Sequence, residues 1–164
     1  MLEIIPKFRI IVIEDSLELP VVSLRNLDYD ILRMKVRSAL LKSTNEISAE
    51  DGIRTSLRLG DSCLIIGEVR SVEAKALYEA MRVGALANVV AGTIHGASPY
   101  GVFDRVVNDL EVPATSFKAT DVITICNPIK SPDGLESKKR VVQLTEVRKH
   151  WKEDPLREKG FVDL

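Results

Sequence analysis

The strongest constraint on the fold is the alternation of short apolar runs with longer segments of helical spacing. Four runs are rich in β-branched residues and have the length of buried strands: residues 8–15 (FRIIVIED), 63–67 (CLIIG), 88–95 (NVVAGTIH) and 121–129 (DVITICNPI). Continuous apolar runs of this kind are typical of strands covered on both faces. The sequence therefore predicts an α/β fold with a largely parallel sheet and helices on both of its faces.

Helix signals lie between the predicted strands. Residues 48–60, 71–84 and 98–110 each begin at a serine suited to cap a helix, and the first two end at a glycine. Residues 28–43 also have apolar residues near helical spacing. Near the C-terminus, the turn signal at 131–134 (SPDG) precedes an alternating segment at 139–151, which predicts an antiparallel pair of strands at an edge of the sheet.

Length and composition indicate one globular domain. The 164 residues favour a single domain over 1–151, followed by a charged tail at 152–164 that we expect to be poorly ordered. The net charge of -1 implies no bulk attraction to nucleic acid or to a membrane. Cys63 and Cys126 each lie in an apolar run, so we expect both to be buried in a protein of a reducing compartment. We expect no signal peptide, because Glu3 and Pro6 interrupt any apolar region near residue 1, and no apolar run approaches the roughly 20 residues of a membrane span.

Polar residues follow three of the predicted strands. They are Glu14, Asp15 and Glu18 after the first, Glu68 and Arg70 after the second, and Thr93 and His95 at the end of the third. A single charged residue after a strand is most often the place where a loop meets water. Because ligands of parallel α/β sheets bind beyond the carboxyl ends of the strands, three such ends together indicate a site.

The chemistry of this cluster favours a phosphate-bearing ligand or a divalent cation. Glu68 and Glu14 supply the oxygen ligands that Mg²⁺ prefers, and Mg²⁺ usually brings phosphate oxygens with it. A glutamate can instead act as a general base that activates water. Gly67 allows a ligand to approach the backbone closely.

Three segments resemble the secretion ATPase superfamily, which drives type II and type IV secretion, type IV pili and the archaeal flagellum-like motors. The segments are RIIVIEDSLEL (9–19), GIRTSLRLGDSCLIIGEVRSVEAKALYEAMRVGA (52–85) and GTIHGAS (92–98), in the family's order, and their wording is closest to the archaeal branch. The resemblance extends over residues 8–150. It implies a RecA-like fold, a homo-oligomer in the form of a hexameric ring, and ATP and Mg²⁺ as ligands. It further implies a membrane platform protein as partner, no nucleic acid, and a cytoplasmic location at the inner face of the membrane.

The resemblance also assigns roles. The family's Asp box corresponds to Glu14, Asp15 and Glu18, its Walker B segment to Leu64–Glu68, and its His box to Thr93–His95. Glu68 matches the catalytic glutamate and Arg70 the arginine that would hold this carboxylate or a subunit contact in place. Glu14 and His95 are the further catalytic candidates. Arg54 and Arg58 fall in the family's arginine-bearing helix before Walker B, where a solvated helix face is an equally good interpretation.

Two departures from the family pattern matter. The sequence contains no GxxxxGK[ST], the Walker A loop that holds the triphosphate, so we expect the C-terminal half of a motor domain that is inactive alone and holds no nucleotide tightly. In addition, Gly84-Ala85-Leu86 stands where many relatives have a histidine.

Three functions stay open at this stage. The first is the catalytic portion of an ATP-driven secretion or pilus motor, and the second is a non-hydrolysing binding or scaffolding subunit of such a ring. The third, least favoured, is a small metal-dependent hydrolase that uses Glu14, Glu68 and His95.

Overall fold

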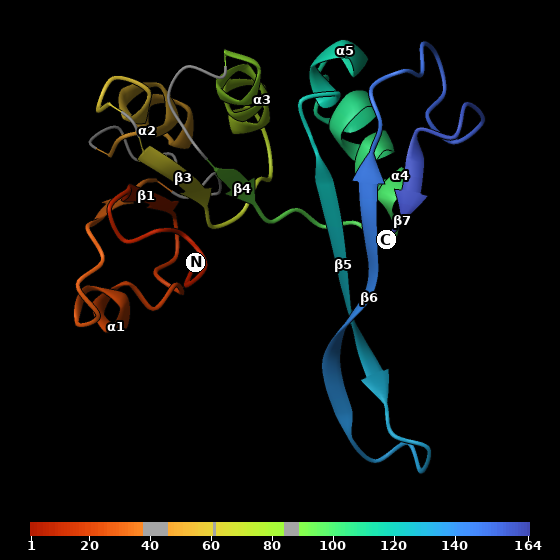
Figure 1. Ribbon diagram of the computed structural model, residues 1–164, viewed down its shortest axis with the longest axis horizontal. Coiled ribbons are helices and arrows are strands. Elements are labelled where there is room, and N and C mark those ends of the chain that lie inside the picture. Colours follow the sequence, from red (N-terminus) through yellow and green to blue (C-terminus); the bar gives the residue numbers. More distant parts are fainter. Residues whose placement is uncertain (38–45, 61, 84–88) are drawn as a thin grey trace. The chain divides into compact units, whose positions relative to one another are not determined.

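The chain folds into two compact units, Met1–Ile94 and His95–Leu164 (Figure 1). The computed structural model describes residues 1–37, 46–60, 62–83 and 89–164. Part of the segment 28–43, and the Gly84–Leu86 position of the missing histidine, lie outside the described residues.

The first unit is built on a parallel sheet. Its strands are β1 (Arg9–Glu14), β2 (Ile31–Lys35), β3 (Ser62–Ile66) and β4 (Val90–Gly92), in the order β2-β1-β3-β4. Every neighbouring pair is parallel, and Ile13 is in register with Met34 on one side and Ile66 on the other. The parallel sheet predicted from the apolar runs is confirmed.

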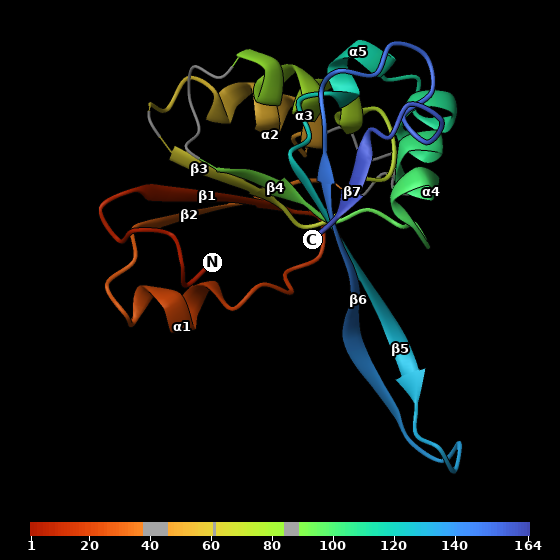
Figure 2. The same cartoon turned by 45° about the vertical axis from the view of Figure 1, so that its right-hand side comes forward.

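Helices cover both faces of this sheet (Figure 2). On one face α1 (Val21–Arg25) contributes to a core cluster whose members are Ile10, Val12, Val21, Leu24, Ile31 and Cys63. On the other face lie α2 (Ala49–Ser56) and α3 (Glu73–Val83). Gly52 of α2 faces the side chains of Ile13 and Val36 so closely that a Cβ there would lie 3.1 Å from Val36 Cγ1.

Local signals located the starts of α2 and α4 correctly, but one segment was misread. Ser48 Oγ accepts a hydrogen bond from the Asp51 amide at 3.1 Å, and Ser98 Oγ accepts one from Gly101 at 3.1 Å, so two of the three predicted serine caps are confirmed. The helical interpretation of 28–43 is wrong for Ile31–Lys35, which form β2. Pairing with the buried strand β1 outweighs the local spacing there, because the backbone groups along that side of β1 need a partner.

The second unit combines short helices with an antiparallel sheet. The helical segments are α4 (Pro99–Asp104), the π-helical turn η1 (Arg105–Asp109) and α5 (Ala114–Phe117). The strands β5 (Val122–Lys130), β6 (Ser137–Val147) and β7 (Phe161–Asp163) follow the order β5-β6-β7. The predicted antiparallel pairing is confirmed, but these strands form a sheet of their own and not an edge of the parallel sheet.

Trp151 organises the core of the second unit. Its side chain is fully buried, its ring lies edge-on to Phe103 at 5.6 Å, and Lys118 Nζ lies 4.5 Å from the ring centroid. Phe103 in turn packs edge-on against Phe117 at 5.1 Å.

The segment 152–164, where we expected a charged tail, contains a hydrogen-bonded turn and the strand β7. The Glu158 carboxylate accepts hydrogen bonds from the amides of Lys152, Glu153 and Asp154, which lower the pKa of Glu158, and β7 then pairs with β6. The charged residues that predicted disorder are therefore partly used as hydrogen-bond acceptors for the turn.

The two cysteines differ in exposure. Cys63 is buried as expected, and burial raises the pKa of its thiol. Cys126 is exposed, contrary to expectation, because it lies on the same exposed face of β5 as Val122 and Thr124, opposite the buried Ile123 and Ile125. None of the described helices has the length and apolar character to cross a membrane.

We predict that Gly160→Ala destabilises the second unit by about 1–3 kcal/mol, because a Cβ there would overlap Trp151 Cδ1 and lie 3.0 Å from the Pro155 carbonyl oxygen. Urea unfolding followed by the fluorescence of the single tryptophan measures this change. Gly101→Ala is the matched control, since a Cβ there meets only Ser98 Oγ at 3.3 Å. Equal midpoints for the two variants would contradict the tight packing around Trp151.

Candidate functional site

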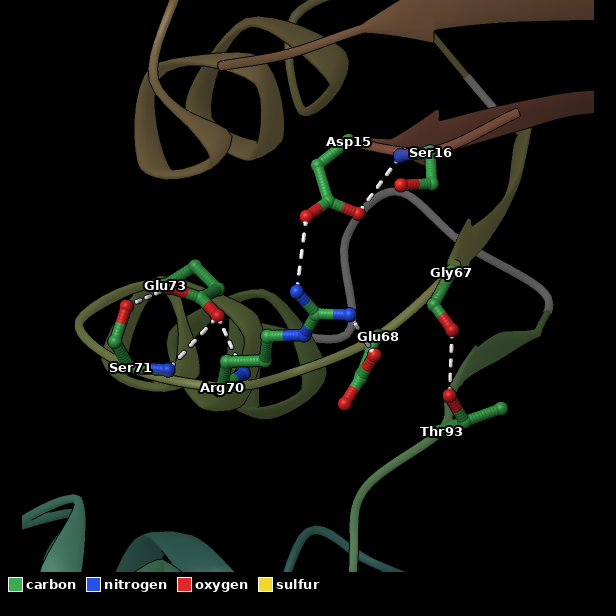
Figure 3. Close-up of polar contacts among 8 residues, drawn as sticks. All are labelled: Asp15, Ser16, Gly67, Glu68, Arg70, Ser71, Glu73 and Thr93. Atoms are coloured by element: carbon green, nitrogen blue, oxygen red, sulfur yellow. Dashed lines mark hydrogen bonds and ion pairs between the residues drawn. The ribbon is translucent and has the colours of Figure 1, made fainter. Parts of the chain in front are cut away.

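The carboxyl ends of β1, β3 and β4 meet at one edge of the parallel sheet. The Gly67 amide donates to the Ile13 carbonyl at 2.8 Å, which extends the pairing of β1 and β3 past the end of β3. The Val69 amide donates to the Thr93 carbonyl at 2.8 Å, and the Thr93 hydroxyl donates to the Gly67 carbonyl (Figure 3). Glu14, Glu68 and Thr93 therefore lie at the same edge of the sheet.

Arg70 links two of these strand ends. Its Nη2 donates to Glu68 Oε2, and its Nη1 lies 3.3 Å from Asp15 Oδ2, so one guanidinium contacts an acid after β3 and an acid after β1 (Figure 3). The hydrogen bond to Glu68 raises the pKa of Arg70 above its ordinary value, as do the charges of Asp15 and Glu18. The two opposite charges that follow the buried strand β3, Glu68 and Arg70, therefore contact each other.

Glu14 has a different environment from Glu68. It is 2% exposed, its Oε1 accepts the amides of Glu18 at 3.0 Å and Leu19 at 2.8 Å, and its Oε2 lies 3.2 Å from Arg33 Nε of β2. The carboxylate thus holds the turn after β1. Asp15 is therefore the residue of the predicted Asp box that is linked to Glu68 through Arg70, whereas Glu14 contacts the turn after β1 and Arg33.

Glu73, in the first turn of α3, is a buried acid with a structural role. It is 5% exposed and accepts hydrogen bonds from the Arg70 amide at 2.5 Å, the Ser71 amide at 2.9 Å and the Ser71 hydroxyl at 2.7 Å. Burial by itself raises the pKa of the Glu73 carboxyl, but these hydrogen bonds outweigh it and lower the pKa. Glu73 therefore fixes the backbone that carries Arg70 (Figure 3).

A small cavity of about 90 Å³ opens beside this network, between the ends of β1 and β3 and the first turns of α2 and α3. Its polar lining residues are Asp15, Arg37, Ser48, Glu50, Glu68, Arg70, Ser71 and Glu73. Ligand pockets for whole small molecules usually measure about 300–1,000 Å³. The cavity therefore suits a hydrated ion or one phosphate group, and a whole nucleotide would need further surfaces.

The remaining candidates are more dispersed. Glu18 is exposed, and Arg54 pairs with Glu50 one helical turn earlier, at 2.9 Å. Arg58 is exposed beyond the end of α2. His95 is the first residue of the second unit, whereas Glu68 belongs to the first unit. The role of His95 therefore stays a prediction from the sequence.

The acids of the site do not form a metal cage by themselves. Within the described ranges, no group of three or more His, Cys, Asp or Glu side chains is arranged to hold a metal ion. A hydrated Mg²⁺ needs only one or two protein carboxylates when phosphate and water complete its shell. The donor chemistry of Glu68 and Asp15 fits that case.

Comparison with protein families gives a match over almost the whole chain. The family described as "Type II/IV secretion system protein" matches residues 2–151. Two proteins of Methanocaldococcus jannaschii, both without an assigned function, are similar to it. One is 35% identical over 101 residues, which is 62% of this chain and 34% of that protein. The other is 28% identical over 110 residues, which is 66% of this chain and 19% of that protein.

Solved structures share the fold at low sequence identity. The VirB11 ATPase from the Brucella suis type IV secretion system, solved with sulphate, superposes with a TM-score of 0.60 at 18% identity, covering 85% of this chain and 40% of that one. The Legionella pneumophila ATPase DotB gives a TM-score of 0.64 at 12% identity, covering 92% and 39%. The chain thus spans well under half the length of these proteins.

We predict that Glu73→Gln lowers the free energy of unfolding by about 1–3 kcal/mol at neutral pH, because an amide cannot accept all three hydrogen bonds. The pKa of Glu73 is lowered in the folded state, so its contribution is complete above the unfolded pKa of about 4.3 and is lost as the pH falls through the folded value. The difference between wild type and variant should shrink over that acidic range.

Urea unfolding at a series of pH values measures this difference. Glu79→Gln, at an exposed position of the same helix α3, is the control and should leave the free energy of unfolding nearly unchanged. A loss in Glu73→Gln no larger than in the control would show that this carboxylate does not hold the Arg70 backbone.

Proposed function

The chain belongs to the type II/IV secretion system protein family, and from that premise we propose that it is the C-terminal catalytic portion of an ATP-hydrolysing motor for secretion or pilus assembly. The observation that carries the proposal is the link from Glu68 through Arg70 to Asp15 at the carboxyl edge of a parallel sheet. This is the edge where ligands of such sheets bind.

In the proposed mechanism Glu68 orients the attacking water and accepts its proton. The side chain follows a buried strand, and the Gly67 and Val69 backbone hydrogen bonds hold the backbone on both sides of Glu68. Arg70 holds one carboxylate oxygen, and Glu73 holds the backbone of Arg70. Such positioning matters because a general base acts only within hydrogen-bond reach of the proton it takes.

ATP and Mg²⁺ are the ligands of the complete protein in this proposal. Bound Mg²⁺ would offset the charge of the phosphates, and Glu68 with Asp15 would hold it, directly or through water. The adjacent cavity has the size of one phosphate group. Without a positive ion, these carboxylates would repel a polyphosphate.

The other candidates have supporting roles in the proposal. Glu14 keeps the turn after β1 in place through the Glu18 and Leu19 amides, and Thr93 fixes the Gly67 carbonyl. His95 senses the terminal phosphate. Arg54, on the exposed side of α2, and Arg58, just beyond the end of α2, would contact the phosphates of a neighbouring subunit in a ring.

The assembly proposed for the complete protein is a hexameric ring that acts on a membrane platform protein from the cytoplasmic side. The 164 residues include no GxxxxGK[ST], the motif of the phosphate-binding loop. The backbone amides and the lysine of that loop make most of the contacts that bind a triphosphate. The isolated chain should therefore bind nucleotide weakly and show no turnover.

We predict that, in a complete protein containing the phosphate-binding loop, Glu68→Gln slows ATP hydrolysis by about 10²–10⁴-fold while ATP affinity changes little, because the substitution removes the base and keeps its size. Steady-state phosphate release and titration with a fluorescent ATP analogue separate turnover from binding. Glu79→Gln, at an exposed position of α3, serves as the control.

His95→Ala in the same protein should lower turnover with affinity largely kept. Equal losses of affinity and turnover in Glu68→Gln would mean that Glu68 builds the binding site and is not the base. Saturable, Mg²⁺-dependent phosphate release by the 164-residue chain would contradict the proposed need for the phosphate-binding loop.

A further inference from the structure

The end of the β5–β6 ribbon has no packing support within its own unit. Residues 126–142, called the arm below, run from Cys126 through the turn to Val142 and extend beyond β7 and the helices of the second unit (Figure 1). No residue of the arm is buried. β7 pairs with β6 only at Thr145–Val147, which leaves both edges of the arm without a strand partner among the described residues.

The turn at the end of the arm is nevertheless well defined. The Ser131 amide donates to the Glu136 carbonyl at 2.8 Å, and the Glu136 amide donates to Ser131 Oγ at 3.0 Å. Asp133 Oδ1 accepts the Leu135 amide at 3.1 Å. This turn presents Leu135 with 86% of its surface exposed, more than any other large hydrophobic side chain of the described residues.

Positive charge surrounds this apolar end. The arm contains two acids and four cations, which are Lys130, Lys138, Lys139 and Arg140. By contrast, the whole chain has a net charge of -1. The pairs Pro128–Lys139 and Ile129–Lys138 are successive, so their side chains point to opposite faces of the ribbon. The cations therefore leave the arm from both faces, behind an apolar end.

We propose that the arm inserts end-on into the surface of a bilayer that contains anionic lipid. Leu135 and Ile129 enter the boundary between headgroups and acyl chains, while the four cations contact phosphate groups around the arm. Polybasic segments bind anionic bilayers in this way, and apolar side chains add to the binding. The inference is independent of the nucleotide chemistry proposed above.

Other occupants fit these features less well. A second copy of the arm would bring the same cations together, and Pro128 lacks an amide to donate along the free edge of β5. Nucleic acid would leave Leu135 unused, and the arm contains no aromatic side chain on which a base could stack. A flat protein surface would meet the cations of one face only.

The test uses the 164-residue chain and vesicles of phosphatidylglycerol or of phosphatidylcholine, with binding measured by flotation. We expect binding to phosphatidylglycerol only, weakened by added salt. Lys138→Glu with Lys139→Glu should lower the partition constant by about tenfold or more. The control with the same charge change is Lys152→Glu with Arg157→Glu, at exposed positions outside the arm, and should bind almost as wild type.

A second pair of variants, one in the arm and one outside it, tests the apolar part of the contact. Leu135→Ser should weaken binding several-fold, whereas Leu156→Ser, at a residue 60% exposed elsewhere in the same unit, should not. All four variants alter exposed side chains, and unchanged Trp151 fluorescence confirms that the core is intact. Equal binding to both lipids, no binding to either, or equal effects of arm and control variants would each overturn the proposal.

Discussion

The guanidinium of Arg70 holds together the part of the structure on which the proposed chemistry depends. It contacts Glu68 after β3 and Asp15 after β1, two acids that are far apart in the chain but adjacent in the sheet. Two carboxylates this close would repel each other without a cation between them. The sheet register brings the acids together, and Arg70 makes their proximity stable.

The packing around Glu14, at the ends of the same strands, is also tight. A Cβ at Gly67 would lie 3.1 Å from Glu14 Cγ, so the glycine leaves room for the buried Glu14 carboxylate and its ion pair with Arg33. One sheet edge thus supports two networks. The Glu14 network secures the loop after β1, and the Asp15–Arg70–Glu68 network faces the cavity.

Much of this arrangement could be predicted from the sequence, because the relevant signals are local. Apolar runs predicted strands β1, β3 and β4, and serine caps predicted the starts of α2 and α4. The common edge followed from the parallel order of the strands. What local signals could not supply was the face on which each polar side chain lies. Glu14 and Asp15 are neighbours in the chain, yet only Asp15 contacts Arg70, and that depends on the pleat and on β2.

The remaining misses have the same origin in long-range contacts. The strand β2 is set by pairing with β1, and the segment 152–164 contains a turn held by Glu158 and a strand that pairs with β6. Cys126 looked buried because its run is apolar, but it lies on the exposed face of β5. The hydrogen bonds of Glu73 likewise depend on a turn whose shape the sequence does not specify.

A double-mutant cycle on ATP turnover tests the central claim most directly. In the complete protein, turnover would be measured for Arg70→Gln, for Glu68→Gln and for the two together. If Arg70 acts by holding Glu68, the double variant should be no slower than Glu68→Gln alone, since residues that act as a unit are strongly non-additive. Losses that simply multiply would show that Arg70 and Glu68 act independently and would contradict the account.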